Sequence, residues 1–127
     1  MLNITRKVSI LALFICFNSS AENINILKMY NQFTAVSAAS GKCMSPQKDE
    51  LTDFLANYQM VTTLMYQEIK KRKPDFTEEQ AKKAIKMGSS KVTTAVYKVI
   101  ETESCDSPKI QDLIKRFHVQ AKWKPSA

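Results

Sequence analysis

The sequence predicts an all-α fold: a small three- or four-helix bundle built on a long antiparallel helical hairpin that one disulfide closes. Three observations support this prediction. The 127 residues are 44% apolar and include only 2 Gly and 4 Pro, which suits one small domain with few turns. Apolar residues recur at steps of three and four over long stretches. Two cysteines bracket the two longest of these stretches.

The amino-terminal segment has the three-part layout of a secretory signal peptide. Basic residues precede an apolar stretch over residues 8–17, and Ser19 and Ala21 supply small side chains at the cleavage position. The apolar stretch has about half of the roughly 20 residues that a membrane-spanning helix needs, which favours cleavage over an uncleaved anchor. We therefore expect residues 1–21 to be removed on export, leaving residues 22–127 as a single helical domain, periplasmic or secreted.

Two helices are predicted in the first half of this domain. Residues 24–38 fit a helix only loosely, and a loop is expected at Ser40-Gly41-Lys42, where Gly41 can take a positive φ. Residues 46–72 form the clearest helix, with Ser45 as its cap and Pro46 in the first helical position. Its apolar stripe is Leu51, Phe54, Leu55, Tyr58, Val61, Met65 and Ile69.

Two further helices are predicted in the second half. Thr77 and Gln80 form a capping box at the start of residues 78–102, and Gly88 marks a bend or a close helix crossing in the middle of that helix. Ser107-Pro108 repeats the cap-then-proline pattern and starts a helix over residues 108–121.

The cysteines predict one covalent constraint. Cys16 leaves with the leader, so in an oxidising compartment Cys43 and Cys105 have only each other within the chain. Pro74 is the midpoint between them and also the centre of the connection between the two long helices. A disulfide there would close the open end of a hairpin formed by residues 46–72 and 78–102.

No motif for catalysis or cofactor binding is found, so we predict a protein that is not an enzyme and has no cofactor. His118 is the single histidine and the cysteines are expected to be oxidised, so a zinc or copper site lacks ligands. The chain has no glycine-bearing nucleophile elbow of the G-x-S-x-G type and no glycine-rich phosphate loop. No catalytic and no metal-binding residues are assigned.

Basic clustering is the remaining functional signal. The formal net charge is +7, or +5 for residues 22–127, in which 17 basic residues face 12 acidic ones. Such a surface suits acidic protein surfaces or anionic lipid head groups, whereas export argues against nucleic acid. The candidate binding surface is Lys70, Lys71, Arg72, Lys73, Lys82, Lys83 and Lys86, together with Trp123 in the tail.

Two resemblances agree with an exported helical protein. The segment Phe76-Thr77-Glu78-Glu79-Gln80 resembles the L-T-x-x-Q signature of helical periplasmic stress chaperones, although that family usually shows the motif twice. The architecture, two cysteines around a helical core, is similar to small acid-stress periplasmic chaperones and to immunity proteins against peptidoglycan-cleaving toxins. Neither likeness assigns a functional residue.

The expected function is therefore that of an exported, non-enzymatic binding protein whose partner is another protein. A chaperone, an inhibitor or immunity protein, and an envelope adaptor all remain open at this point. The alternative is a secreted effector that acts at an anionic membrane surface through its basic face. Oligomeric state is not predicted.

Overall fold

The computed structural model describes residues 25–124, which form four helices and, within this range, no strand. The helices are α2 (Ile26–Cys43), α3 (Lys48–Arg72), α4 (Glu78–Glu103) and α5 (Pro108–Lys122). The all-α prediction is thus confirmed for this part of the chain. The predicted leader, residues 1–21, lies outside the described residues.

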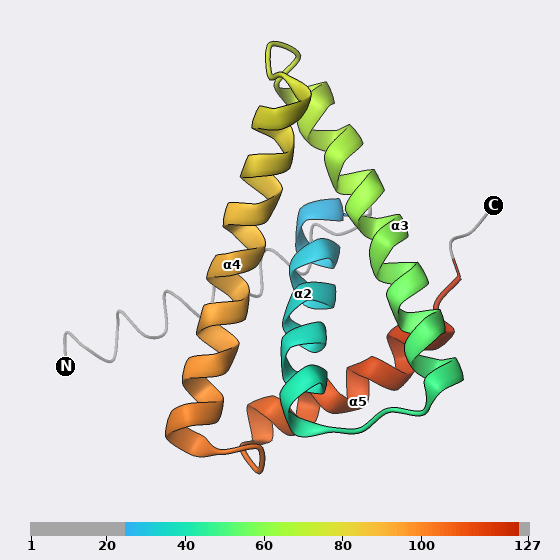
Figure 1. Ribbon diagram of the computed structural model, residues 1–127, viewed down its shortest axis with the longest axis vertical. Coiled ribbons are helices and arrows are strands. Elements are labelled where there is room, and N and C mark those ends of the chain that lie inside the picture. The colour runs from blue at the N-terminus through green and yellow to red at the C-terminus, as the bar shows by residue number, and fades with distance from the viewer. Residues whose placement is uncertain (1–24, 125–127) are drawn as a thin grey trace, which may run out of the picture.

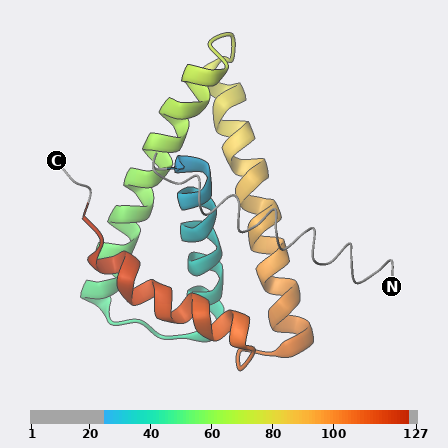
Figure 2. The same cartoon turned by 180° about the vertical axis from the view of Figure 1, so that it is seen from behind.

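The arrangement of the helices differs from a simple hairpin. Helices α3 and α4 meet at the turn over residues 73–77 and spread apart away from it (Figure 1). Helix α2 lies between them and packs against all three other helices, and α5 crosses the wide end, as the view from behind shows (Figure 2). The two long helices therefore pack mainly on α2 rather than on each other.

Helix α2 occupies the centre because its buried side chains surround the helix axis. Tyr30, Val36, Ala38 and Ala39 are all buried, and at 100° per residue they point in different directions around the helix. A helix that is apolar all round belongs in the interior. This explains why residues 24–38 fitted a one-sided helical stripe only loosely: the helix has no single apolar face.

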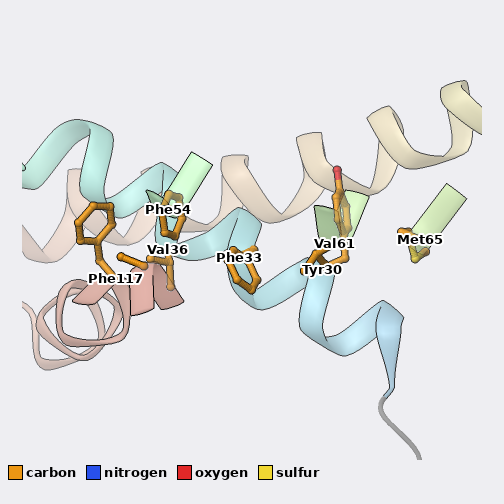
Figure 3. Packing of buried hydrophobic residues seen from close by; sticks show 8 residues of the cluster. Tyr30, Phe33, Val36, Phe54, Val61, Met65 and Phe117 are labelled. Atoms are coloured by element: carbon orange, nitrogen blue, oxygen red, sulfur yellow. The ribbon is translucent and has the colours of Figure 1, made fainter. Parts of the chain in front are cut away.

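The main core runs along α2 and α3 (Figure 3). Aromatic rings fill its wide end: Phe54 lies 4.8 Å from Phe117 and 5.6 Å from Phe33, measured between ring centroids. Towards the α3–α4 turn the core narrows to Val61 and Met65 of α3. Most of the buried aromatic surface is therefore at the end that α5 crosses.

The predicted disulfide is confirmed. Cys43 and Cys105 are joined, with an S–S distance of 2.00 Å and their Cα atoms 5.5 Å apart. Cys43 is the last residue of α2, and Cys105 lies in the α4–α5 turn. The bond thus ties the central helix to the end of α4, beside a second small core cluster that includes Ala39 and Ile110.

The predicted loop at residues 40–42 is wrong. Helix α2 continues through this segment to Cys43, and no glycine in the described range has a positive φ. The physical reason is tertiary packing. Ala38, Ala39 and Ser40 are buried, so their contacts favour the helix over the turn that Gly41 alone would allow.

The start of α3 also differs from the prediction. The helix begins at Lys48, Pro46 lies outside it, and Gln47 takes the cap position without a side-chain hydrogen bond. For α4 the predicted capping box is confirmed. The backbone N–H of Gln80 donates to Thr77 Oγ1, and the backbone N–H of Thr77 donates to the side-chain Oε1 of Gln80.

Gly88 does not mark a close crossing. A Cβ atom built there would meet nothing within 4 Å, and α4 is one continuous helix. The packing on α4 does not require a glycine at this position.

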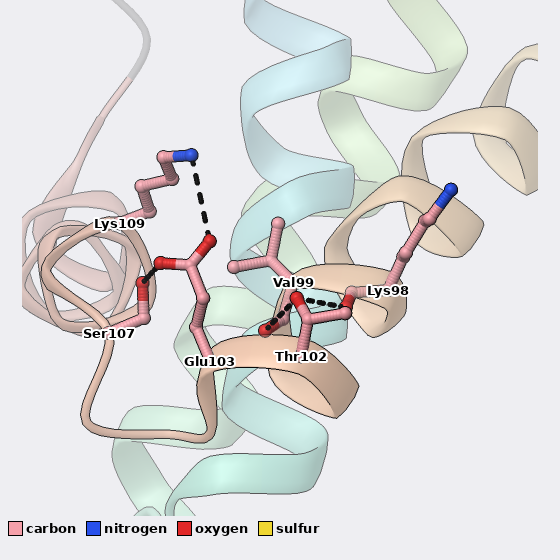
Figure 4. A network of polar contacts seen from close by, with 6 residues as sticks. All are labelled: Lys98, Val99, Thr102, Glu103, Ser107 and Lys109. Carbon is pink, nitrogen blue, oxygen red and sulfur yellow. Dashed lines mark hydrogen bonds and ion pairs between the residues drawn. The ribbon is translucent and has the colours of Figure 1, made fainter.

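A polar network orders the α4–α5 turn (Figure 4). Ser107 precedes Pro108, the first residue of α5, as predicted, but its hydroxyl donates to Glu103 Oε1 at 3.1 Å instead of capping the helix. Lys109 Nζ lies 3.8 Å from the same carboxylate. These contacts hold the first turn of α5 against the last turn of α4, next to the disulfide.

Candidate functional site

The turn between α3 and α4 is a well-defined structure. The Phe76 amide donates to the Lys73 carbonyl at 3.0 Å, and Lys70 Nζ donates to the Phe76 carbonyl at 2.5 Å. The capping box at Thr77 then starts α4. Because both helix ends and the turn are hydrogen-bonded, the backbone positions from which the side chains extend are fixed relative to one another.

Seven of the predicted binding residues gather at this turn, and we call them the basic apex. The last turn of α3 and its cap supply four, and the first turns of α4 supply three. Helices α3 and α4 converge here, so the structure brings the two predicted groups to one end of the molecule (Figure 1). The basic apex consists of Lys70, Lys71, Arg72, Lys73, Lys82, Lys83 and Lys86.

Only part of this charge is neutralised locally. Arg72 lies 2.9 Å from Glu68, and Lys82 lies 3.2 Å from Glu78, both as exposed pairs four residues apart on one helix. Such pairs contribute little to stability. Within residues 25–124, no ion pair engages the exposed side chains of Lys71, Lys73, Lys83 and Lys86.

Acidic residues limit the net charge of this end. Its seven basic side chains lie among four acidic ones, Glu68, Asp75, Glu78 and Glu79, which leaves a net charge of +3. The surface is therefore a mixed pattern of charges with a positive excess. A pattern of this kind suits a protein surface whose carboxylates lie opposite the lysines better than it suits a uniformly negative membrane surface.

Trp123 does not belong to the basic apex. Its ring packs edge-on against Phe33 with centroids 6.0 Å apart, and its carbonyl accepts a hydrogen bond from Asn57 Nδ2 at 2.7 Å. Asn57 is 13 residues from Lys70 on α3, about 20 Å along the helix. The tryptophan closes the wide end of the core instead of joining the lysines.

His118 is held by an acidic partner. Its Nδ1 lies 2.7 Å from Glu50 Oε2, and its ring meets that of Phe117 edge-on. The contact joins α5 to the first turn of α3. Among residues 25–124 no group of three His, Cys, Asp or Glu side chains is placed to hold a metal ion.

Burial raises the pKa of Tyr58 to about 12. The Tyr58 hydroxyl lies 2.7 Å from Thr34 Oγ1, which in turn donates to the Tyr30 carbonyl. That hydrogen bond to Thr34 lowers the pKa in part, and Tyr30 raises it further. This phenol is a half-buried bridge between α2 and α3 at the edge of the core, away from the basic apex.

Sequence reasoning missed a shallow apolar groove at the wide end. It has a volume of about 280 Å³ and lies against the α2–α3 connection, with Met44, Leu51, Leu55 and Phe117 among its lining residues. Leu55 was assigned to the core stripe but is 49% exposed. The periodicity could not reveal this exposure. Leu55 does fall on the apolar stripe of α3, but no other helix within residues 25–124 packs over it.

The binding surface predicted from the sequence ended at Lys86, although α4 carries further lysines beyond it. Lys91 and Lys98 are exposed on the same helix, and no acidic residue occurs between Gln80 and Ile100. The absence of acidic residues between Gln80 and Ile100 was the signal in the sequence that could have extended the predicted binding surface along α4.

The chain matches no protein-family model, no curated protein and no solved structure. No helix within residues 25–124 is long and apolar enough to cross a membrane.

Proposed function

We propose that this chain is an exported, non-enzymatic helical binding protein that contacts its partner through the basic apex. The observation that supports this most is the set of exposed lysines without an ion pair in the described residues, on the two helices that meet at the hydrogen-bonded α3–α4 turn: Lys71, Lys73, Lys83 and Lys86. Lys71 and Lys73 at the carboxyl end of α3 gain some stability from the helix dipole, but Lys83 and Lys86 near the start of α4 gain none. The gathering of all four at one end is better explained by a partner of opposite charge.

Export is supported by two features of different kinds. The disulfide between Cys43 and Cys105 is typical of proteins from oxidising compartments. The first 21 residues have the composition of a cleavable leader, with the cut expected before Glu22. The proposed location is the periplasm or the extracellular space.

The proposed partner is another protein with an acidic surface. A chaperone, an inhibitor or immunity protein, and an envelope adaptor all act through such contacts. The alternative, an effector at an anionic membrane surface, is favoured only by the positive excess of the apex. The four interspersed carboxylates oppose it, because a uniformly negative surface repels them.

Export is tested by expressing the full chain with its own first 21 residues and measuring the mass of the recovered protein. We expect an oxidised chain that begins at Glu22, recovered outside the cytoplasm. A chain that keeps Met1 and stays in the cytoplasm contradicts the location.

Binding is tested with a charge-reversed apex, Lys71→Glu with Lys73→Glu, and a matched control, Lys115→Glu with Lys122→Glu. Each pair reverses two exposed lysines: Lys71 and Lys73 at the carboxyl end of α3, and Lys115 and Lys122 in the middle and at the end of α5. We expect a defined protein from the native envelope fraction to cross-link to the wild type and to the control but not to the apex variant. Equal cross-linking of all three proteins contradicts the proposal.

The membrane alternative has its own measurement. Vesicles of phosphatidylcholine alone and vesicles with added phosphatidylglycerol are sedimented with the protein at physiological salt. The proposal expects no cosedimentation with either. Binding to the anionic vesicles that is lost in the apex variant supports the membrane effector instead.

A further inference from the structure

Helix α4 carries an unusual distribution of charge. Between Gln80 and Ile100 it has five lysines and no acidic residue, and the acids of this helix stand only in its first and last turns. Helix α2, which packs along α4, has no acidic residue either. On these two helices the stretch of α4 between Gln80 and Ile100 and the whole of α2 therefore lack the carboxylates that elsewhere pair with lysines.

Four residues of α4 form a line on its outer side, which we call the α4 outer face: Lys83, Met87, Lys91 and Lys98. They follow one another at steps of four, four and seven, so at 3.6 residues per turn they share one side of the helix. All four are exposed, whereas Ala81 and Val96 on the opposite side are buried. The line is about 22 Å long.

The lysines of this face have no partner in the described part of the chain. The ion pairs of α4 are at its ends, between Lys82 and Glu78 and between Glu103 and Lys109. In Figure 4 the side chain of Lys98 points away from the Glu103 network. The one large apolar side chain exposed on α4 is Met87, at 55%, and it lies between Lys83 and Lys91.

The chemistry of the face favours a protein partner over a membrane. The apolar side of α4 is buried against the rest of the molecule, so it cannot insert among lipid chains while the protein is folded. Adsorption by three lysines alone corresponds to a dissociation constant of about millimolar or weaker. Methionine is enriched at protein interfaces, and exposed charges beside it fix the register with a partner of opposite charge.

We propose that the α4 outer face binds an acidic helical segment of a partner protein, with carboxylates opposite Lys83, Lys91 and Lys98 and an apolar side chain on Met87. The proposal rests on the proposed function, since it extends the basic apex along α4 and names the chemistry of the partner. The spacings of eight and seven residues between the three lysines match carboxylates placed about two helical turns apart on a facing helix. Methionine adapts its shape to the apolar side chain that it meets.

The test uses a synthetic probe and the oxidised, leader-free chain. The probe is a fluorescein-labelled 22-residue alanine-rich peptide with glutamates two turns apart along one face and a leucine among them. A second peptide has the same composition with its glutamates spread around the helix. Binding is followed by fluorescence anisotropy at physiological salt.

We expect the double variant Lys91→Glu with Lys98→Glu to weaken binding of the one-faced peptide about tenfold or more. Met87→Ser is expected to weaken it several-fold. The control Lys115→Glu with Lys122→Glu should leave the affinity within about twofold, because these lysines lie on α5. Circular dichroism and melting curves identify any variant whose loss comes from unfolding.

Three results overturn the inference. The first is equal affinity for the two peptides. The second is equal loss in the α5 control. The third is tighter binding of a 20-base-pair DNA duplex or of phosphatidylglycerol vesicles that depends on Lys91 and Lys98 in the same way.

The same variants separate this inference from the proposed function. If reversal of Lys71 and Lys73 abolishes cross-linking to the native partner while reversal of Lys91 and Lys98 does not, the outer-face inference fails and the proposed function stands. If neither reversal changes cross-linking, both fail.

Discussion

The two ends of this molecule are built differently. At the wide end α2, α3 and α5 enclose stacked aromatic rings, and the disulfide joins α2 to the α4–α5 turn. Two of its ion pairs join different elements, His118–Glu50 and Lys109–Glu103, and a third, Arg116–Asp112, lies within α5. At the basic apex the ion pairs lie within single helices, and lysines remain unpaired.

This difference indicates where the stability of the fold resides, and it agrees with the proposed binding role of the basic apex. Contacts between elements far apart in sequence hold the fold together, whereas contacts four residues apart stabilise only one helix. Substitutions at the apex should therefore leave the fold intact and change binding. Substitutions at the wide end should act mainly through stability.

The largest expected effect is at the aromatic core. Phe117→Ala should lower the free energy of unfolding by roughly 3–5 kcal/mol, because Phe117 is fully buried against Phe54 and a cavity remains. The matched control is Val119→Ala, two residues later on α5, where the side chain is 68% exposed and the change should stay within about 0.5 kcal/mol. Urea unfolding measures both. Similar losses for the two variants contradict the assignment of stability to this end.

The disulfide ranks next. Cys105→Ser should destabilise the oxidised protein by about 2–4 kcal/mol, because the bond closes a loop of 62 residues in the unfolded chain. Under reducing conditions wild type and variant should melt at nearly the same temperature. The measurement is calorimetry in oxidising and in reducing buffer, and equal melting under oxidising conditions shows that the bond adds no stability.

At the apex the capping box offers a smaller effect. Thr77→Ala should cost about 1 kcal/mol, because the amide of Gln80 loses its acceptor at the start of α4. Thr94→Ala is the control, since Thr94 is exposed in the middle of the same helix and alanine suits that position at least as well. If Thr77→Ala lowers the free energy of unfolding as much as Phe117→Ala does, then the two ends do not differ in their contribution to stability.

The smallest expected signal is the titration of one phenol. The pKa of Tyr58 is raised from 10.0 to about 12, so the folded protein keeps a proton that the unfolded chain releases between these values. The contribution of Tyr58 to stability is therefore complete below pH 10 and is lost as the pH rises towards 12. Absorbance at 295 nm should show one of the four tyrosines ionising near pH 12, and Tyr58→Phe should remove that step. A variant that keeps the late step disproves the assignment.

Local signals in the sequence were predictive where the interaction itself is local. The capping box of Thr77 and Gln80 needs only residues three apart, and it is present. The pairing of Cys43 and Cys105 followed from there being no other cysteine in residues 22–127, and it is also present. The clustering of apex lysines followed from a short turn between two long helices.

Other local signals were overruled by packing. Gly41 indicated a loop, but the burial of Ala38 and Ala39 continues the helix through it. Pro46 indicated a helix start, yet α3 begins at Lys48. Trp123 was grouped with the lysines by composition, and its ring packs on Phe33 instead. For the helix through Gly41 and for Trp123 the deciding contacts are with residues far away in the sequence.

The sequence by itself determined that residues 25–124 are helical, where most helices begin and end, and which cysteines pair. These properties depend on periodicity, on capping within a few residues and on elimination. The tertiary structure alone decided that α2, with apolar residues on all sides, lies between α3 and α4, and that the α4 lysines line an outer surface. Periodicity shows which side of a helix is apolar, but only the packed chain shows what covers that side.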